Sequence, residues 1–127
     1  MSHLSSMKTS FQKLIYLEKA LTKLNIRYNR KHFEKEHTPA GAQINLIIPQ
    51  SNHYDLEFAW NGNSYELVVD VSFWAQRYPI EIFLEKVTQK YAMENLVGES
   101  QKQGFQVINS QKNLEGVTEL LVERWNY

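Results

Sequence analysis

Residues 54–70 read YDLEFAWNGNSYELVVD, and this stretch decides the fold. Two runs that alternate apolar and polar residues flank Asn61-Gly62, the dipeptide that best tolerates positive φ at both central positions of a type I′ turn. The stretch therefore predicts a β-hairpin with a two-residue loop, in which Trp60 faces Asn63. The same register places three further pairs on one face of the sheet: Phe58 with Tyr65, Leu56 with Leu67, and Tyr54 with Val69.

The opposite face of this hairpin is acidic, because it collects Asp55, Glu57, Glu66 and Asp70. The predicted register sets Glu57 directly across from Glu66, a like-charge pair that destabilises a sheet. An open sheet face provides no desolvation to separate carboxyl pKa values, so acid–base catalysis is not predicted here. Two interpretations stay open, a solvated face neutralised by nearby basic residues and a docking surface for a basic partner.

Two amphipathic helices lie on either side of the hairpin in the sequence. Apolar residues at helical spacing predict the first over residues 11–24, with Ser10 as its N-cap and Asn25 closing it. Pro79 stands at the expected first turn of the second helix, whose apolar stripe loosens near Gly98 and which ends by Gly104.

Further strands are indicated wherever polar and apolar residues alternate between turn signals. The segments 34–41 and 113–116 have no apolar period and predict a loop and a turn. The remaining predicted strands, of which the first is weak, are residues 4–8, 26–33, 43–48, 105–108 and 117–125.

These elements predict an α+β fold in one domain, residues 1–127. Strands joined by short turns pair antiparallel, and two amphipathic helices suffice to cover one face of a sheet. We therefore expect an antiparallel sheet of six to seven strands with both helices on one face, in the order β-α-β-β-β-β-α-β-β. That order resembles ferredoxin-like or TATA-binding-protein-like arrangements.

Composition excludes several chemistries. The 127 residues contain no Cys, which rules out thiolate nucleophiles, thiolate metal sites and disulfides. No glycine-rich phosphate loop or Gly-x-Ser-x-Gly elbow occurs. The four histidines lack zinc-site spacing, so neither a metal nor a cofactor is predicted. The longest apolar run has four residues, which predicts no transmembrane helix, and the first residues do not predict a secretory signal.

The net charge of zero conceals an asymmetry along the chain. Residues 1–48 hold eight basic and three acidic residues, and residues 49–127 hold six basic and eleven acidic ones. Aromatic and cationic residues alternate in the strand that runs through residues 27–35, a composition that suits a single-stranded nucleic-acid platform. The cations that would bind nucleic acid are Arg27, Arg30 and Lys31. The same alternation also follows when a strand has one buried and one solvated face.

The loop of residues 71–78 joins a predicted strand to a predicted helix. Loops held between rigid elements often carry function. The candidates in and beside it are Trp74, Arg77 and Asp70.

Short segments spread over the chain carry a resemblance. They are MSHLS with Lys8-Thr9, Asn61-Gly62 with YELVVD, Phe83 with QKYA at 89–92, Gly104-Phe105, and Arg124-Trp125. In them the sequence resembles the conserved plastid and cyanobacterial family called hypothetical chloroplast reading frame thirty-five, a domain of unknown function. The resemblance implies a place in the plastid stroma or the cyanobacterial cytoplasm, and it brings no catalytic residues. The matching stretches nominate Tyr65, Glu66, Asp70, Tyr91, Arg124 and Trp125, for function or for support of the fold.

Two functional hypotheses follow. The favoured one is a non-enzymatic interaction or assembly module that docks an unidentified protein partner through the acidic hairpin face or the loop of residues 71–78. The alternative is a nucleic-acid-binding protein that uses the basic strand, which the balanced total charge disfavours. An enzyme ranks third, because no catalytic constellation is found.

Overall fold

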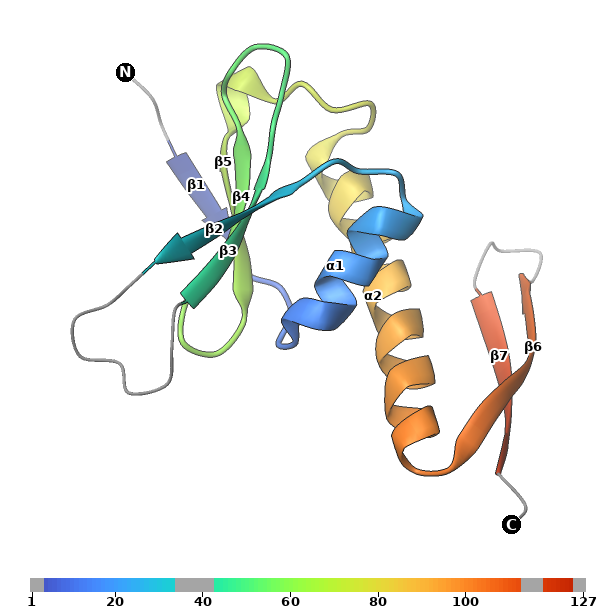
Figure 1. Cartoon of the computed structure of the whole chain (residues 1–127). Helices are drawn as coiled ribbons and strands as arrows, with labels where there is room; N and C mark the ends of the chain where they lie inside the picture. The colour runs from blue at the N-terminus through green and yellow to red at the C-terminus, as the bar shows by residue number, and fades with distance from the viewer. Residues whose placement is uncertain (1–3, 34–42, 113–117, 125–127) are drawn as a thin grey trace.

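Five strands form one antiparallel sheet in the order β1-β5-β4-β3-β2 (Figure 1). This computed structural model describes residues 4–33, 43–112 and 118–124. Both helices, α1 (Leu14–Lys23) and α2 (Ile80–Lys102), pack on the same face of the sheet, as predicted. The strands of the sheet are β1 (Leu4–Met7), β2 (Asn29–Phe33), β3 (Gln43–Ile48), β4 (Leu56–Trp60) and β5 (Tyr65–Asp70).

The last two strands do not join this sheet, so the single sheet of six to seven strands is wrong. β6 (Phe105–Lys112) and β7 (Thr118–Arg124) pair only with each other among the described strands. The 23 residues of α2 extend about 35 Å and carry the chain away from the sheet before β6 begins (Figure 1). Along the chain the predicted order holds except for a short 3₁₀-helix, η1 (Val71–Phe73), between β5 and α2.

The β4–β5 hairpin has a longer loop than predicted. Trp60 pairs with Tyr65 rather than with Asn63, which shifts the register by two residues. The cause is the side chain of Asn61, whose Oδ1 accepts hydrogen bonds from the backbone N–H groups of Asn63 and Ser64 and closes a four-residue loop. An even shift keeps every side chain on its predicted face, so the alternation of buried and open positions survives.

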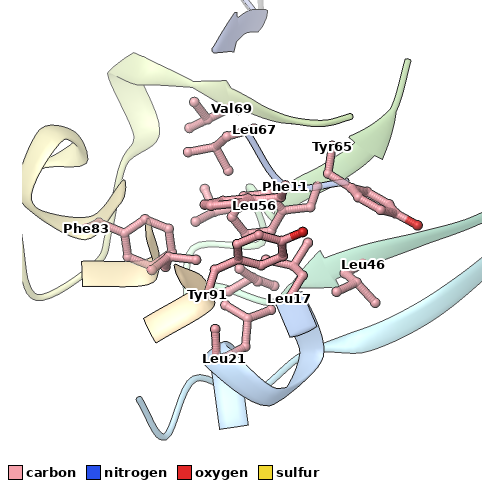
Figure 2. Close-up of a cluster of buried hydrophobic side chains, with 14 of the residues drawn as sticks. Phe11, Leu17, Leu21, Leu46, Leu56, Tyr65, Leu67, Val69, Phe83 and Tyr91 are labelled. Carbon is pink, nitrogen blue, oxygen red and sulfur yellow. The ribbon is translucent and has the colours of Figure 1, made fainter. Parts of the chain in front are cut away.

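The core lies between the sheet and the two helices (Figure 2). Phe11 is its central ring, with centroids 5.9 Å from Phe58 of β4 and 4.8 Å from Tyr91 of α2. Each fully buried aliphatic or aromatic side chain of this kind stabilises the fold by about 1.5–3 kcal/mol. The side chains that fill the core from the sheet are Leu46, Ile48, Leu56, Phe58, Tyr65, Leu67 and Val69.

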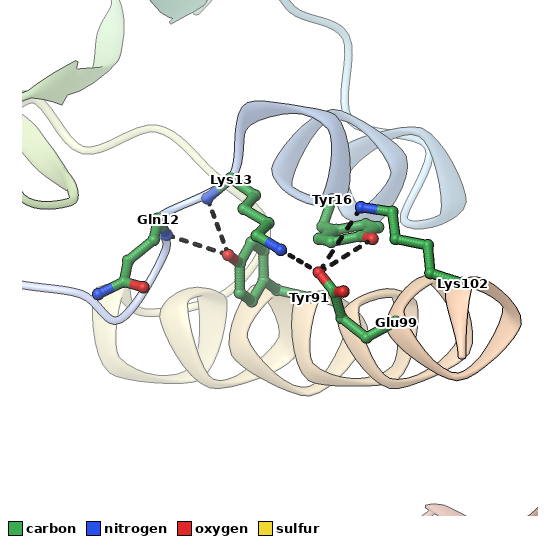
Figure 3. Close-up of polar contacts among 6 residues, drawn as sticks. All are labelled: Gln12, Lys13, Tyr16, Tyr91, Glu99 and Lys102. Atoms are coloured by element: carbon green, nitrogen blue, oxygen red, sulfur yellow. Dashed lines mark hydrogen bonds and ion pairs between the residues drawn. The ribbon is translucent and has the colours of Figure 1, made fainter.

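The start of α1 differs from the prediction, because Ser10 is not its N-cap. The helix begins at Leu14, and no side chain of its own segment caps it. Instead the hydroxyl oxygen of Tyr91 on α2 accepts hydrogen bonds from the backbone N–H groups of Gln12 and Lys13, both at 3.0 Å (Figure 3). A residue distant in sequence thus serves the N–H of the N-cap residue Lys13 and that of the residue before it.

Candidate functional site

A cleft of about 460 Å³ opens where the turn after α1, the end of β3 and the start of α2 meet. Its described lining includes three cations and no acidic residue. The cations are Arg27, Arg77 and Lys86, which stand with Tyr78 around apolar side chains. Those apolar side chains are Leu24, Ile26, Ile48 and Phe83.

Arg27 reaches the cleft because α1 ends in a defined turn. Asn25 adopts the left-handed conformation with φ 58°, and its N–H donates to Thr22 O at 3.0 Å. The N–H of Ile26 donates to Leu21 O at 2.9 Å, which completes the Schellman pattern of a helix C-terminus. Asn25 therefore closes the helix as predicted, and the turn delivers Arg27 to the edge of the cleft.

Arg77 and Lys86 meet at the ring of Tyr78. The guanidinium carbon of Arg77 lies 5.5 Å from the ring centroid, and Lys86 Nζ lies 4.6 Å from it. Both are cation–π contacts, which hold the cations in place and leave their charge unneutralised. No described carboxylate forms an ion pair with Arg27, Arg77 or Lys86.

Gln50 anchors the loop that carries Arg77. This side chain is 7% exposed, and its Oε1 accepts from Ala75 N at 2.8 Å and from Gln76 Nε2 at 3.0 Å. Its Nε2 donates to Phe73 O at 3.1 Å and also to Tyr54 O. Gln50 is not among the residues predicted from the sequence, since an isolated Gln after a strand-ending Pro carries no recognisable signal.

Trp74 also supports this loop. Its indole Nε1 donates to Tyr78 O at 2.7 Å, and its ring meets Phe83 edge-on at 5.2 Å. Of the candidates in this loop, Arg77 therefore lines the cleft, and Trp74 holds the backbone next to it.

The acidic residues of the hairpin are engaged within the fold. Asp55 Oδ1 accepts from Gln50 N at 3.0 Å, and the buried Asp70 caps η1 by accepting from Ser72 N at 3.1 Å. These two carboxylates serve local turns.

The two glutamates of that face do not oppose each other, which corrects the predicted like-charge pair. Glu57 pairs across the strands with Val68, and Glu66 pairs with Ala59. Glu57 lies 3.8 Å from the ammonium group of Lys31, and Glu66 Oε1 accepts from Asn61 Nδ2 at 2.9 Å. Neutralisation from a neighbouring strand, one of the two interpretations left open, is thus present at Glu57.

The three cations of the nucleic-acid alternative do not form one patch. Arg30 turns toward α1, where Glu18 accepts from its Nε at 2.8 Å and from its Nη2 at 2.9 Å. Lys31, the next residue along the strand, points to the opposite face and reaches Glu57. Of Arg27, Arg30 and Lys31, only Arg27 is in the described lining of the cleft.

Besides Glu66 and Asp70, the family resemblance nominated four residues. Tyr65 and Tyr91 are buried and bond to backbone, Tyr65 through a hydroxyl that donates to Ile44 O at 3.2 Å. Trp125 and the side chain of Arg124 lie outside the described residues.

Within the described part of the chain, no three His, Asp or Glu side chains gather to hold a metal ion. No described helix is long and apolar enough to cross a membrane.

Comparison with known proteins gives a consistent family. The family "Protein of unknown function (DUF1257)" matches residues 20–121. "Uncharacterized protein ycf35" of Trieres chinensis is 46% identical over 118 residues, 91% of this chain and 92% of that protein. The ycf35 proteins of Guillardia theta and Pyropia yezoensis are 36% and 35% identical and cover 98% and 100% of both chains. No solved structure matches this chain significantly.

Proposed function

This chain belongs to the DUF1257 family, and ycf35 proteins are among its relatives. We propose that it is a non-enzymatic interaction module whose cationic cleft binds an acidic segment of a partner protein. The observation that carries the proposal is the convergence of Arg27, Arg77 and Lys86 on one cleft without an acidic neighbour in its described lining.

Charge and shape both favour a carboxylate-bearing segment. Three cations around an apolar floor attract a carboxylate more strongly than the same cations spread over an open surface, because the cleft walls exclude part of the solvent. Arginine also offers paired N–H donors that match the two oxygens of a carboxylate.

A protein partner fits this geometry better than a nucleic acid. A nucleic-acid groove follows the phosphate backbone with a line of cations and stacking rings. The cations here surround one cleft of about 460 Å³, and Arg30 and Lys31, which would extend the line, are paired with Glu18 and Glu57.

The lining also supports a binding role over a catalytic one. General acid–base catalysis needs a group whose pKa lies near the working pH, most often His, Asp or Glu. The described lining holds none of these residues, and its ionisable groups are arginine, lysine and tyrosine side chains.

We place the protein in the plastid stroma, or in the cytoplasm of a cyanobacterium, as the ycf35 resemblance implies.

Site-directed photo-cross-linking tests the proposal. Tyr78→p-benzoylphenylalanine keeps an aromatic ring at the cleft, and the matched control places the same group at Leu96, a 46% exposed position on α2. After irradiation in organelle extract, the cross-linked peptide is sequenced by mass spectrometry. We expect an acidic peptide at position 78, absent at position 96, and lost when Arg77→Gln and Lys86→Gln are added.

Charge-matched substitutions complete the design. Lys8→Gln with Lys19→Gln removes the same charge from exposed positions outside the cleft and should leave the cross-link intact. A cross-link to nucleic acid or lipid, or a peptide whose capture is indifferent to the cleft cations, would overturn the proposal.

A further inference from the structure

We infer that the acidic segment also carries an apolar side chain, which docks on the exposed aromatic pair of Tyr54 and Phe73. This inference rests on the proposed function and names the chemistry of its partner: acidic residues for the cleft and a nearby aliphatic or aromatic residue for the pair.

The pair is an unusual surface feature. The rings of Tyr54 and Phe73 stack in parallel, with centroids 3.7 Å apart and planes 4° from parallel. Although stacked on each other, the two residues remain 43% and 37% exposed. Exposed apolar side chains gathered in one place are typical of interaction sites.

The backbone beneath the pair is held rigidly. Phe73 O accepts hydrogen bonds from Asn52 Nδ2 at 2.8 Å and from Gln50 Nε2 at 3.1 Å. Tyr54 N donates to Asn52 Oδ1 at 3.1 Å, and Tyr54 O accepts from Gln50. A surface that is ordered in advance loses little conformational freedom on binding, which favours affinity.

The pair and the cleft share an anchor and lie within reach of one peptide. Gln50 bonds to Phe73 on one side and to Ala75 and Gln76 on the other, and Arg77 follows directly. Phe73 and Arg77 are four positions apart in the chain, so their Cα atoms lie at most about 14 Å apart. An extended segment of about five residues spans that distance.

An anionic membrane could also offer charge beside apolar groups, but the geometry favours a peptide. A membrane surface meets cations arranged on an outward plane or along a helix. Here the three cations line one cleft together with apolar side chains, an arrangement that suits a narrow chain. Vesicle binding is therefore one of the outcomes that the experiment must distinguish.

Fluorescence polarisation with labelled peptides of about ten residues tests the inference. The first peptide combines glutamates with one phenylalanine, the second has alanine for that phenylalanine, and the third has glutamine for the glutamates. Phe73→Ala should weaken the first peptide by roughly three- to tenfold and leave the second unchanged. Arg77→Gln with Lys86→Gln should weaken both glutamate peptides.

The outcomes separate the two proposals. If Phe73→Ala has no effect but the charge substitutions weaken binding, the aromatic contact is wrong and the cleft assignment stands. If the wild-type protein binds no glutamate peptide, or binds the glutamine peptide equally, the proposed function itself fails. Binding of phosphatidylglycerol vesicles that depends on Phe73, without peptide binding, overturns the inference in favour of a membrane. Ile15→Ala, at a 56% exposed position, is the matched control, and Tyr54→Ala, at the other ring of the pair, replaces Phe73→Ala should that variant not fold.

Discussion

A Cβ atom added to Gly98 of α2 would lie 2.4 Å from the hydroxyl oxygen of Tyr16 on α1 and 2.6 Å or less from two ring carbons. The two helices therefore approach each other at a point where only glycine fits. Tyr16 is 3% exposed, and its ring occupies the space that a side chain on α2 would otherwise fill.

Gly98→Ala should consequently destabilise the protein, although alanine is the better helix former. Overpacking costs about 1–3 kcal/mol, and the gain in helix propensity offsets at most about 1 kcal/mol of it. Urea unfolding measures the difference. In a Tyr16→Ala background the same substitution should become neutral or stabilising, and equal effects in both backgrounds would contradict the packing account.

The ion pair between Glu18 and Arg30 ties α1 to β2. Glu18 is 9% exposed and also accepts a hydrogen bond from the hydroxyl of Tyr28 at 3.0 Å. Glu18→Gln removes the charge from this network and should lower the free energy of unfolding by about 1–3 kcal/mol. Glu85→Gln, at an exposed position without an ion pair in the described structure, should change it by less than about 0.5 kcal/mol. Equal effects of the two substitutions would contradict the assigned role.

The contact between Lys13 and Glu99 predicts a pH dependence of stability (Figure 3). A hydrogen bond from Lys13 lowers the pKa of Glu99 below its usual 4.5, and the same bond raises the pKa of Lys13 above 10.5. The carboxylate therefore stabilises the fold fully above pH 4.5 and loses this effect as the pH falls through its lowered pKa. The ammonium group contributes below pH 10.5 and loses its effect as the pH rises through its raised pKa.

Glu99→Gln should remove this dependence. Thermal unfolding of both proteins should show the wild type as the more stable between pH 4.5 and 10.5, with the difference shrinking toward acid and toward alkali. A difference that stays constant over the whole pH range would show that the ion pair is not its source.

Gln50 should contribute both to the stability of the protein and to the affinity of the cleft for a peptide. Gln50→Ala removes four side-chain hydrogen bonds, one each to residues 54, 73, 75 and 76, and we expect a loss of about 1–3 kcal/mol of stability. Asn52→Ala, which leaves the bonds to Ala75 and Gln76 in place, should weaken peptide binding less. If Gln50→Ala binds the peptide with unchanged affinity, the loop does not need this anchor.

The sequence predicted what local periodicity determines. Alternation at β4 and β5 identified the buried face correctly, because side chains change sides at every residue of a strand. The predicted loop length was wrong because the side chain of Asn61 accepts hydrogen bonds within the loop. The predicted N-cap of α1 was wrong because Tyr91 on the other helix accepts the hydrogen bonds there. The cap leaves no trace in a local pattern, because Tyr91 lies 79 residues from Gln12 along the chain.

The cleft was predicted only in pieces. Arg77 was singled out for its place in the loop, and Arg27 belonged to a competing nucleic-acid hypothesis. Fifty residues separate them, and only the folded chain brings them to the same cleft. Lys86 carries no signal of its own, since a lysine on an amphipathic helix is typical of a solvated face.

A two-dimensional NMR titration with a glutamate-rich peptide tests the central claim most directly. The guanidinium and ammonium resonances of arginine and lysine side chains report which cations meet the peptide. We predict saturable shifts at Arg27, Arg77 and Lys86, and none at the exposed Lys8 and Lys19. Shifts of equal size at all five residues, or shifts that spare the cleft, would contradict the account.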